Sequence, residues 1–161
     1  MGILTKDMKR VVREQRLGFV ATVCPDGTPN LSPKGTTSVW DDGHLMFANI
    51  ASPKTIRNLK KNPSVEINVV DPMKRKGYRF KGNASIFSKK SSEYGKMISF
   101  FADVKSARSR VKDIVLVKVT EASPIISPAY DAGLSEEDLV SRWVKYYDNL
   151  RKGMRPLSSP D

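Results

Sequence analysis

Residues 18–49 read GFVATVCPDGTPNLSPKGTTSVWDDGHLMFAN, and this stretch decides the fold class. Two Asp-Gly pairs, Asp26-Gly27 and Asp42-Gly43, each separate two runs rich in β-branched, apolar and hydroxyl residues. A tight hairpin turn needs a backbone with φ > 0, which glycine adopts freely, so each pair predicts a β-hairpin. Two hairpins in succession predict a meandering antiparallel sheet.

The flanking sequence adds further strands and helices to these hairpins. Alternating or continuous apolar residues predict strands over 64–70, 77–87 and 114–119. Helices are predicted after four capping signals, which are Thr5, Ser52-Pro53, Ser91-Ser92 and Ser135. About six short strands, with helices between and after them, are typical of a small closed antiparallel β-barrel.

The chain of 161 residues has the length of one domain. We expect a single domain over 1–161, with an N-terminal helix over 1–16, the barrel over 17–121 and an extension with a helix over 122–161. Apolar runs fall far short of the roughly 18 residues that cross a bilayer. The amino terminus lacks the apolar core of a signal peptide. We therefore expect a cytoplasmic protein.

The chain contains one cysteine, Cys24, and one histidine, His44. A single cysteine cannot form an internal disulfide, and the two residues offer too few ligands for structural zinc, so we predict no metal site. Ser-His-Asp and Cys-His mechanisms would both depend on His44 as their base, which weighs against hydrolysis.

Two segments carry groups suited to holding an anion. The first is 32–37, where Lys34, Gly35 and three hydroxyl residues lie at one strand entry. Glycine permits close backbone approach, hydroxyls donate hydrogen bonds and lysine adds a charge. A simpler interpretation is a kinked edge strand with Lys34 in solvent.

The second segment is 49–55, with Asn58 one helical turn further on. A helix that begins after Ser52 presents unpaired N–H groups and a partial positive charge, both of which favour a phosphate. A cation such as Lys54 is unfavourable in the first turn unless an anion binds there. The alternative is that Ser52 is a simple cap and Lys54 an exposed side chain.

The order of motifs from about Leu17 to Phe87 resembles the FMN-binding split-barrel superfamily, which includes pyridoxamine 5′-phosphate oxidase and small FMN-binding proteins. The matching motifs cover about half the chain and are Asp-Gly-x-Pro (26–29), Ser-Pro-Lys-Gly (32–35), Leu-Met-Phe-Ala-Asn (45–49), Ser-x-Lys-Thr-x-x-Asn-Leu (52–59), Asn-Pro-x-Val (62–65) and Lys-Gly-Asn-Ala (81–84). This resemblance implies a mainly β (α+β) fold: a small antiparallel split β-barrel with flanking helices and a C-terminal helix.

The resemblance also implies a homodimer with FMN in clefts between its subunits. Lys54 and Thr55 are implied to contact the FMN phosphate, with Ser52 close by, and Asn58 belongs to the same motif. The ribityl chain and the edge of the isoalloxazine are implied to run along the residues Ser32, Pro33, Lys34, Gly35, Thr36 and Asn49. Family members often carry arginine where Pro53 stands, and Lys34 or Arg57 is the candidate to replace that contact. No catalytic acid or base is implied.

By this resemblance the protein is an FMN-dependent oxidoreductase that takes electrons from a small-molecule or nicotinamide donor. Residues 152–157 do not reproduce the arginine-rich motif with which the oxidase holds its vitamin substrate, which makes pyridoxamine phosphate a doubtful substrate. The alternatives are a non-catalytic flavin carrier, or a barrel that binds the deazaflavin F420 or haem.

The charge balance suggests one more class of partner. Lys and Arg number 28 against 17 Asp and Glu, a formal net charge of +11. Basic residues gather at 74–81 and 105–112, and such charge attracts polyanions in a salt-sensitive way. Because no nucleic-acid motif accompanies these patches, nucleic-acid binding is the less favoured interpretation, and guidance of an anionic substrate or nicotinamide cofactor is an alternative.

Overall fold

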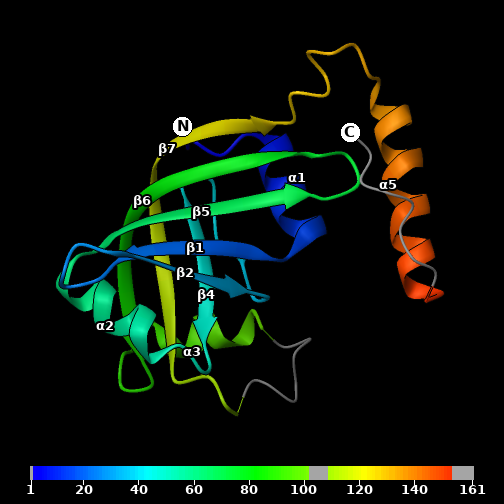
Figure 1. Ribbon diagram of the computed structural model, residues 1–161. Helices are drawn as coiled ribbons and strands as arrows, with labels where there is room; N and C mark the ends of the chain where they lie inside the picture. The colour runs from blue at the N-terminus through cyan, green and yellow to red at the C-terminus, as the bar shows by residue number, and fades with distance from the viewer. Residues whose placement is uncertain (1, 102–108, 154–161) are drawn as a thin grey trace.

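A curled antiparallel sheet with helices around it makes up the protein, as the computed structural model shows for residues 2–101 and 109–153 (Figure 1). Its strands are β1 (Gly18–Val23), β2 (Pro29–Lys34), β3 (Ser38–Val39), β4 (His44–Asn49), β5 (Ser64–Asp71), β6 (Lys76–Ser88) and β7 (Asp113–Ile126). The helices are α1 (Lys6–Gln15), α2 (Pro53–Lys61), α3 (Tyr94–Ser99) and α5 (Glu136–Arg151).

The strand order is β2-β1-β5-β6-β7-β4-β3, so β2 and β3 are the two edges of the sheet. β2 ends at Lys34 and β3 begins at Ser38, so residues 35–37 alone join opposite edges. A link of this length spans at most about 14 Å. The sheet must therefore curl until its edges approach each other. This confirms the mainly β split-barrel class, although no strand ladder closes β2 onto β3 within the described residues.

Both predicted hairpins are confirmed. β1 pairs with β2, with Val23 opposite Pro29, and β3 pairs with β4, with Val39 opposite Leu45. The expected direct meander is wrong, because β5 lies beside β1 and β7 lies beside β4, which separates the two hairpins. Turn signals determine only which neighbouring segments pair. The position of each hairpin in the sheet depends on the burial of apolar strands that are distant in sequence.

In the run that precedes the second Asp-Gly pair, only the two residues of β3 form a strand. Thr37 N–H donates to the Lys34 carbonyl, and its hydroxyl donates to the same oxygen over 2.9 Å, which makes a turn. The Thr36 hydroxyl accepts from Ala48 N–H over 2.9 Å. A side-chain hydroxyl, in place of a backbone carbonyl, thus accepts the hydrogen bond from β4 at this position.

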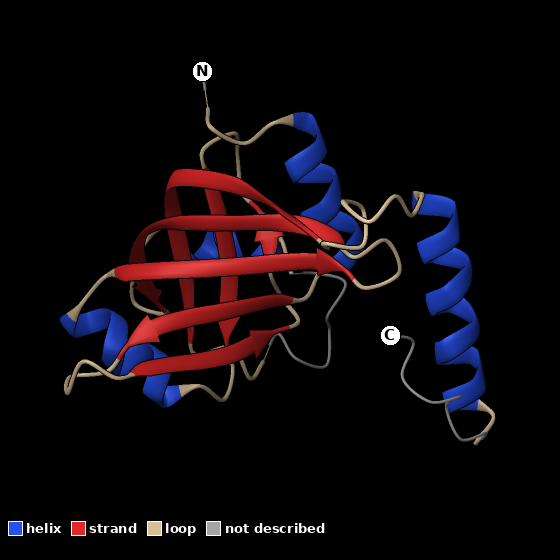
Figure 2. Ribbon diagram, turned by 45° about the horizontal axis from the view of Figure 1, so that its top comes forward, coloured by secondary structure: helices blue, strands red, loops and turns tan. Residues whose placement is uncertain are grey.

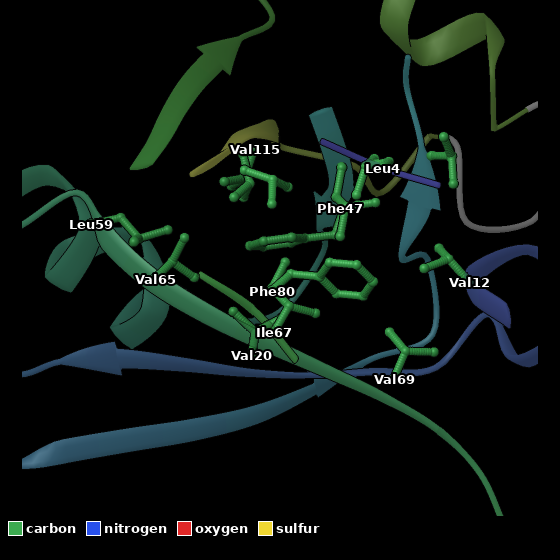
Figure 3. Packing of buried hydrophobic residues seen from close by; sticks show 14 of the residues in the cluster. Leu4, Val12, Val20, Phe47, Leu59, Val65, Ile67, Val69, Phe80 and Val115 are labelled. Atoms are coloured by element: carbon green, nitrogen blue, oxygen red, sulfur yellow. The ribbon is translucent and has the colours of Figure 1, made fainter. Parts of the chain in front are cut away.

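The interior of the barrel is filled from both ends. Phe47 and Phe80 are fully buried at its centre, and smaller aliphatic side chains from several strands point toward them (Figure 3). α1 adds Val12 at one end, while Leu59 of α2 packs at the other (Figures 1 and 3). The remaining members of this core include Leu4, Val11, Val20, Leu45, Ile56, Val65, Ile67, Val69, Val115 and Val117.

β4 is buried on both faces, which explains its continuous apolar sequence. Phe47 points into the barrel, whereas Met46 packs in a second cluster with Met97 and Ile98 of α3. No side chain caps α3, so the cap expected at Ser91-Ser92 is wrong. The Ser91 hydroxyl instead donates to the Ser88 carbonyl over 2.9 Å.

The predicted caps at Thr5 and Ser135 are confirmed. The Thr5 hydroxyl accepts from Met8 N–H over 3.2 Å, and Ser135 forms a full capping box with Asp138. α5 stands apart from the barrel in both ribbon views (Figures 1 and 2). It is held at the β5–β6 turn, where Glu136 forms ion pairs of 2.9 Å with Lys74 and 3.1 Å with Lys76.

The outer face of β1 and β2 is apolar and exposed. Four side chains make up this outer patch, with exposed fractions of 42% for Leu17, 41% for Phe19, 38% for Val23 and 65% for Leu31. β2 is an edge strand that carries two prolines, Pro29 and Pro33. Separately, no helix within residues 2–101 and 109–153 is both long and apolar enough to span a membrane.

Candidate functional site

Lys34 ends β2 with its side chain inside the molecule, only 5% exposed. Its Nζ donates hydrogen bonds of 2.6 Å to the Oγ atoms of Ser32 and Ser52. The same Nζ lies 6.0 Å from the centroid of the Phe47 ring. The simpler interpretation of Lys34 as a solvated side chain is therefore wrong.

The Lys34 ammonium has no carboxylate partner among the ion pairs of the described residues. Burial lowers the pKa of Lys34, because removal from water penalises the charged form. Hydroxyl dipoles satisfy two of the three N–H donors, but they do not neutralise the charge. The local chemistry therefore favours an anion at this position.

Ser52 occupies the N-cap position of α2, yet its side chain does not cap the helix. Its Oγ accepts from Lys34 instead, so the prediction of Ser52 as a simple cap is wrong. The first-turn N–H groups of a helix without a side-chain cap remain available to a ligand. The buried ammonium and the positive end of the α2 dipole therefore meet at Ser52.

Asn49 joins this network from the end of β4. Its Oδ1 accepts from Ser52 N–H over 3.1 Å, and its Nδ2 donates to Asp113 Oδ2 over 2.8 Å. Only 4% of Asn49 is exposed. Its side chain is therefore committed to holding Ser52 in place. We call Ser32, Lys34, Asn49 and Ser52 the Lys34 cluster.

The predicted contacts on α2 divide between its two faces. Thr55 is buried, and the fully buried Asn58 donates from Nδ2 to Thr22 Oγ1 over 3.1 Å. Lys54 is exposed, close enough to the β1–β2 turn for its charge to help lower the pKa of Asp26, after the larger effect of hydrogen bonds from Thr28. Of these three predicted contacts, Lys54 is the one that faces solvent.

The link after β2 is the open side of the cluster. Gly35 is exposed, and a methyl group at its Cα would meet no neighbouring atom. Pro33 is also exposed, on the face of β2 opposite to Ser32 and Lys34, while the Thr36 hydroxyl accepts from Ala48 N–H. That bond uses a lone pair of the Thr36 hydroxyl and leaves its O–H as a donor, so ligand contacts here are available through the backbone of Gly35 and through the Thr36 side chain.

Sequence reasoning missed Asp113, which orients Asn49. Asp113 lies 64 positions away and reaches the site because β4 pairs with β7 in the register that sets Asn49 opposite Asp113. A strand register of this kind leaves no local signal in the sequence. The sequence indicates only the apolar run of β7, which begins directly after Asp113.

Solved structures share this architecture. HupZ of Group A Streptococcus is 28% identical, with a TM-score of 0.69 over 78% of this chain and 96% of that chain. An FMN-binding protein of Syntrophomonas wolfei is 17% identical, with a TM-score of 0.65 over 77% of this chain and 87% of that chain. HutZ, the heme storage protein of Vibrio cholerae, is 21% identical, with a TM-score of 0.59 over 78% of this chain and 95% of that chain. The last two show the fold alone.

Sequence comparison places the whole sheet within one family. MJ0282, an uncharacterized protein of Methanocaldococcus jannaschii, is 29% identical over 120 residues, 73% of this chain and 78% of that protein. The sequence pattern of pyridoxamine 5′-phosphate oxidase matches residues 4–126. That span includes every strand of the barrel and the Lys34 cluster, and stops before α5. The chain therefore belongs to the pyridoxamine 5′-phosphate oxidase family.

Proposed function

We propose that the protein binds FMN at the Lys34 cluster and works as a flavin-dependent oxidoreductase. One observation carries the proposal. The ammonium of Lys34 is buried at the start of α2 and held by hydroxyls, with no carboxylate beside it among the described residues. The dianionic phosphate of FMN would supply the missing charge.

The residues present fit such a group. Lys34 and Lys54 would bind the phosphate, and the Ser32 and Ser52 hydroxyls would orient the Lys34 ammonium toward it. Asn49 would hold Ser52 in place through the hydrogen bond that its Oδ1 accepts from Ser52 N–H. Bound FMN supplies a redox ring that exchanges electrons with a donor and an acceptor, while the protein supplies position and electrostatics.

Two observations favour flavin over haem. Haem iron is most often held by histidine or a cysteine thiolate. The single histidine, His44, has its Nδ1 within 2.8 Å of Asp41, and the single cysteine, Cys24, is only 6% exposed. Neither lies among the hydrogen-bond partners of the Lys34 cluster.

The proposal includes a homodimer in which both copies contribute to the flavin site. The support is the outer patch of Leu17, Phe19, Val23 and Leu31, which is apolar and exposed. Contiguous apolar surface of this kind marks an interaction site. β2 carries Leu31 on this face and Lys34 on the other, so the interface and the cluster share one strand.

The absorption spectrum of the purified protein, with mass spectrometry of its released ligand, tests the cofactor. We expect the two visible bands of oxidised flavin and the mass of FMN. A Soret band would overturn the proposal in favour of haem, and the mass of F420 would do so in favour of a deazaflavin. Stopped-flow mixing with NADH or NADPH tests the reaction, because a flavin carrier would stay oxidised.

A further inference from the structure

A cleft lies beside the Lys34 cluster, along the side of α2. Its volume is about 490 Å³, within the range of small-molecule sites. One wall is the helix side with Pro53, Arg57, Lys60 and Lys61, and the other is the junction of β4 and β7 with Lys112. We call this cleft the α2 groove.

The charge of the α2 groove is strongly unbalanced. Among the described residues, four cations line it, and the one carboxylate of that lining, Asp113, already accepts from Asn49 over 2.8 Å. None of the four cations takes part in an ion pair within the described part of the chain. All four side chains are exposed, so they are free to reach a ligand.

Helix stability does not account for this arrangement. Lys60 and Lys61 in the last turn of α2 complement the helix dipole. Arg57 lies further inside the helix, and it repels Lys60 and Lys61 at spacings of three and four residues. Lys112 lies on a different element and adds a fourth charge across the cleft. A bound polyanion would attract all four cations and so offset their mutual repulsion.

The dimensions of the groove indicate more than one phosphate. From Pro53 to Lys61 the helix rises about 12 Å, which is longer than a single phosphate can contact. Pro53, which is exposed, adds apolar surface at the end nearer Asn49, where a flat ring can pack. Cations along most of the wall and apolar surface at one end match a base or nicotinamide ring joined to a chain of phosphates.

We propose that the α2 groove binds a nucleotide that carries two or more phosphate groups. Asn49 lines the groove and belongs to the Lys34 cluster, so such a nucleotide would lie beside the proposed flavin site. The proposal does not depend on FMN, because Lys60, Lys61 and Lys112, which supply most of the charge of the groove, are not among the residues assigned to the flavin.

Calorimetric titration of the purified protein with ADP, adenosine and inorganic phosphate tests the proposal. The test variant is Lys60→Gln/Lys112→Gln. The matched control is Lys89→Gln/Lys90→Gln, which removes the same charge from two exposed lysines in the turn after β6. One charge-assisted hydrogen bond corresponds to roughly tenfold or more in affinity.

We expect ADP to bind at least ten times more tightly than phosphate, and adenosine to give no measurable heat. The groove variant should lose at least tenfold in ADP affinity and the control less than twofold, while FMN affinity stays unchanged in both. Equal losses in the two variants would overturn the proposal, since they would show a response to net charge alone. An FMN loss as large as the ADP loss would also overturn it, because the groove would then belong to the flavin site.

The other outcomes are equally decisive. If ADP binds as predicted while FMN fails to bind any form of the protein, the α2 groove stands and the flavin proposal falls. If a single-stranded oligonucleotide binds more tightly than ADP, and Lys60→Gln/Lys112→Gln weakens it in parallel, the groove is a nucleic-acid surface and the nucleotide proposal is wrong.

Discussion

The Lys34 ammonium donates a hydrogen bond of 2.6 Å to the Ser52 hydroxyl, and this contact joins the end of β2 to the start of α2. The two residues lie 18 positions apart, on the two segments that the sequence marks as anion-binding candidates. One hydrogen bond therefore merges two independent sequence signals into a single site.

Replacement of Lys34 by methionine should weaken phosphate recognition without harm to the fold. We expect Lys34→Met to weaken FMN binding roughly ten- to a hundred-fold, the value of one charge-assisted hydrogen bond of about 1.5–3 kcal/mol. Riboflavin lacks the phosphate and should bind the variant and the wild type alike. Paired fluorescence titrations with FMN and riboflavin measure both, and equal losses for the two ligands would contradict the role of Lys34.

We also expect the Lys34→Met variant to be no less stable than the wild type. A well-shaped apolar side chain in place of a buried charge is often neutral or stabilising. Ligand-free Lys34→Met should therefore have a free energy of unfolding at least equal to that of the wild type in urea denaturation. A clear loss of stability would mean that the two serine hydrogen bonds outweigh the cost of desolvation.

Replacement of Lys54 should also weaken FMN binding. Its side chain is exposed at the start of α2, where a cation opposes the helix dipole. Lys54→Ala should weaken FMN binding roughly ten- to a hundred-fold, leave riboflavin unchanged and leave thermal stability unchanged or slightly higher. Unchanged FMN affinity would return Lys54 to the role of a surface residue.

The pH dependence of stability should report on Lys34. Burial lowers the pKa of Lys34 from its ordinary value of 10.5, so the folded state releases this proton more readily than the unfolded chain. The resulting stability is complete above the ordinary pKa and is lost as the pH falls through the lowered one. In ligand-free protein, the stability of the wild type relative to Lys34→Met should rise as the pH is raised from neutral toward the ordinary Lys34 pKa of 10.5. Parallel melting curves for the two proteins across this range would contradict it.

The outer patch should hold the proposed dimer together. Leu31 is 65% exposed, so Leu31→Glu should leave the fold intact while it places a charge in the interface. We expect a monomer by light scattering, with loss of bound FMN. Leu150→Glu on α5, where Leu150 is 42% exposed, is the matched control and should remain dimeric. A Leu31→Glu monomer that keeps one FMN per chain would show that a single copy completes the site.

Local signals account for the parts of the fold that the sequence predicts. The hairpin turns at 26–27 and 42–43 and the caps at Thr5 and Ser135 depend on residues within a few positions of one another, and the structure confirms them. Ser52, like Ser135, is a serine at the start of a predicted helix, but a lysine from β2 donates to its hydroxyl. A tertiary contact overrides the cap there.

The sequence points to the four residues of the Lys34 cluster as candidates, but not to their geometry. Strand periodicity puts Ser32 and Lys34 on one face of β2, and the sequence alone leaves open whether that face is inside. Burial of the facing side chains decides the matter, and it depends on the pairing of β1 with β5, which is distant in sequence. Asp113 enters by the pairing of β4 with β7, which no short motif encodes.

The two prolines of β2 limit how copies of this chain can associate. A free strand edge recruits further strands through its N–H and C=O groups, and proline lacks the N–H. Prolines in sheets sit with the nitrogen turned away from the ladder, so Pro29 and Pro33 leave Leu31 as the one N–H donor among these three alternate positions of the edge. A continuous sheet across two copies is thereby disfavoured. We therefore expect copies of this chain to associate at β2 face to face, through side chains rather than through backbone pairing.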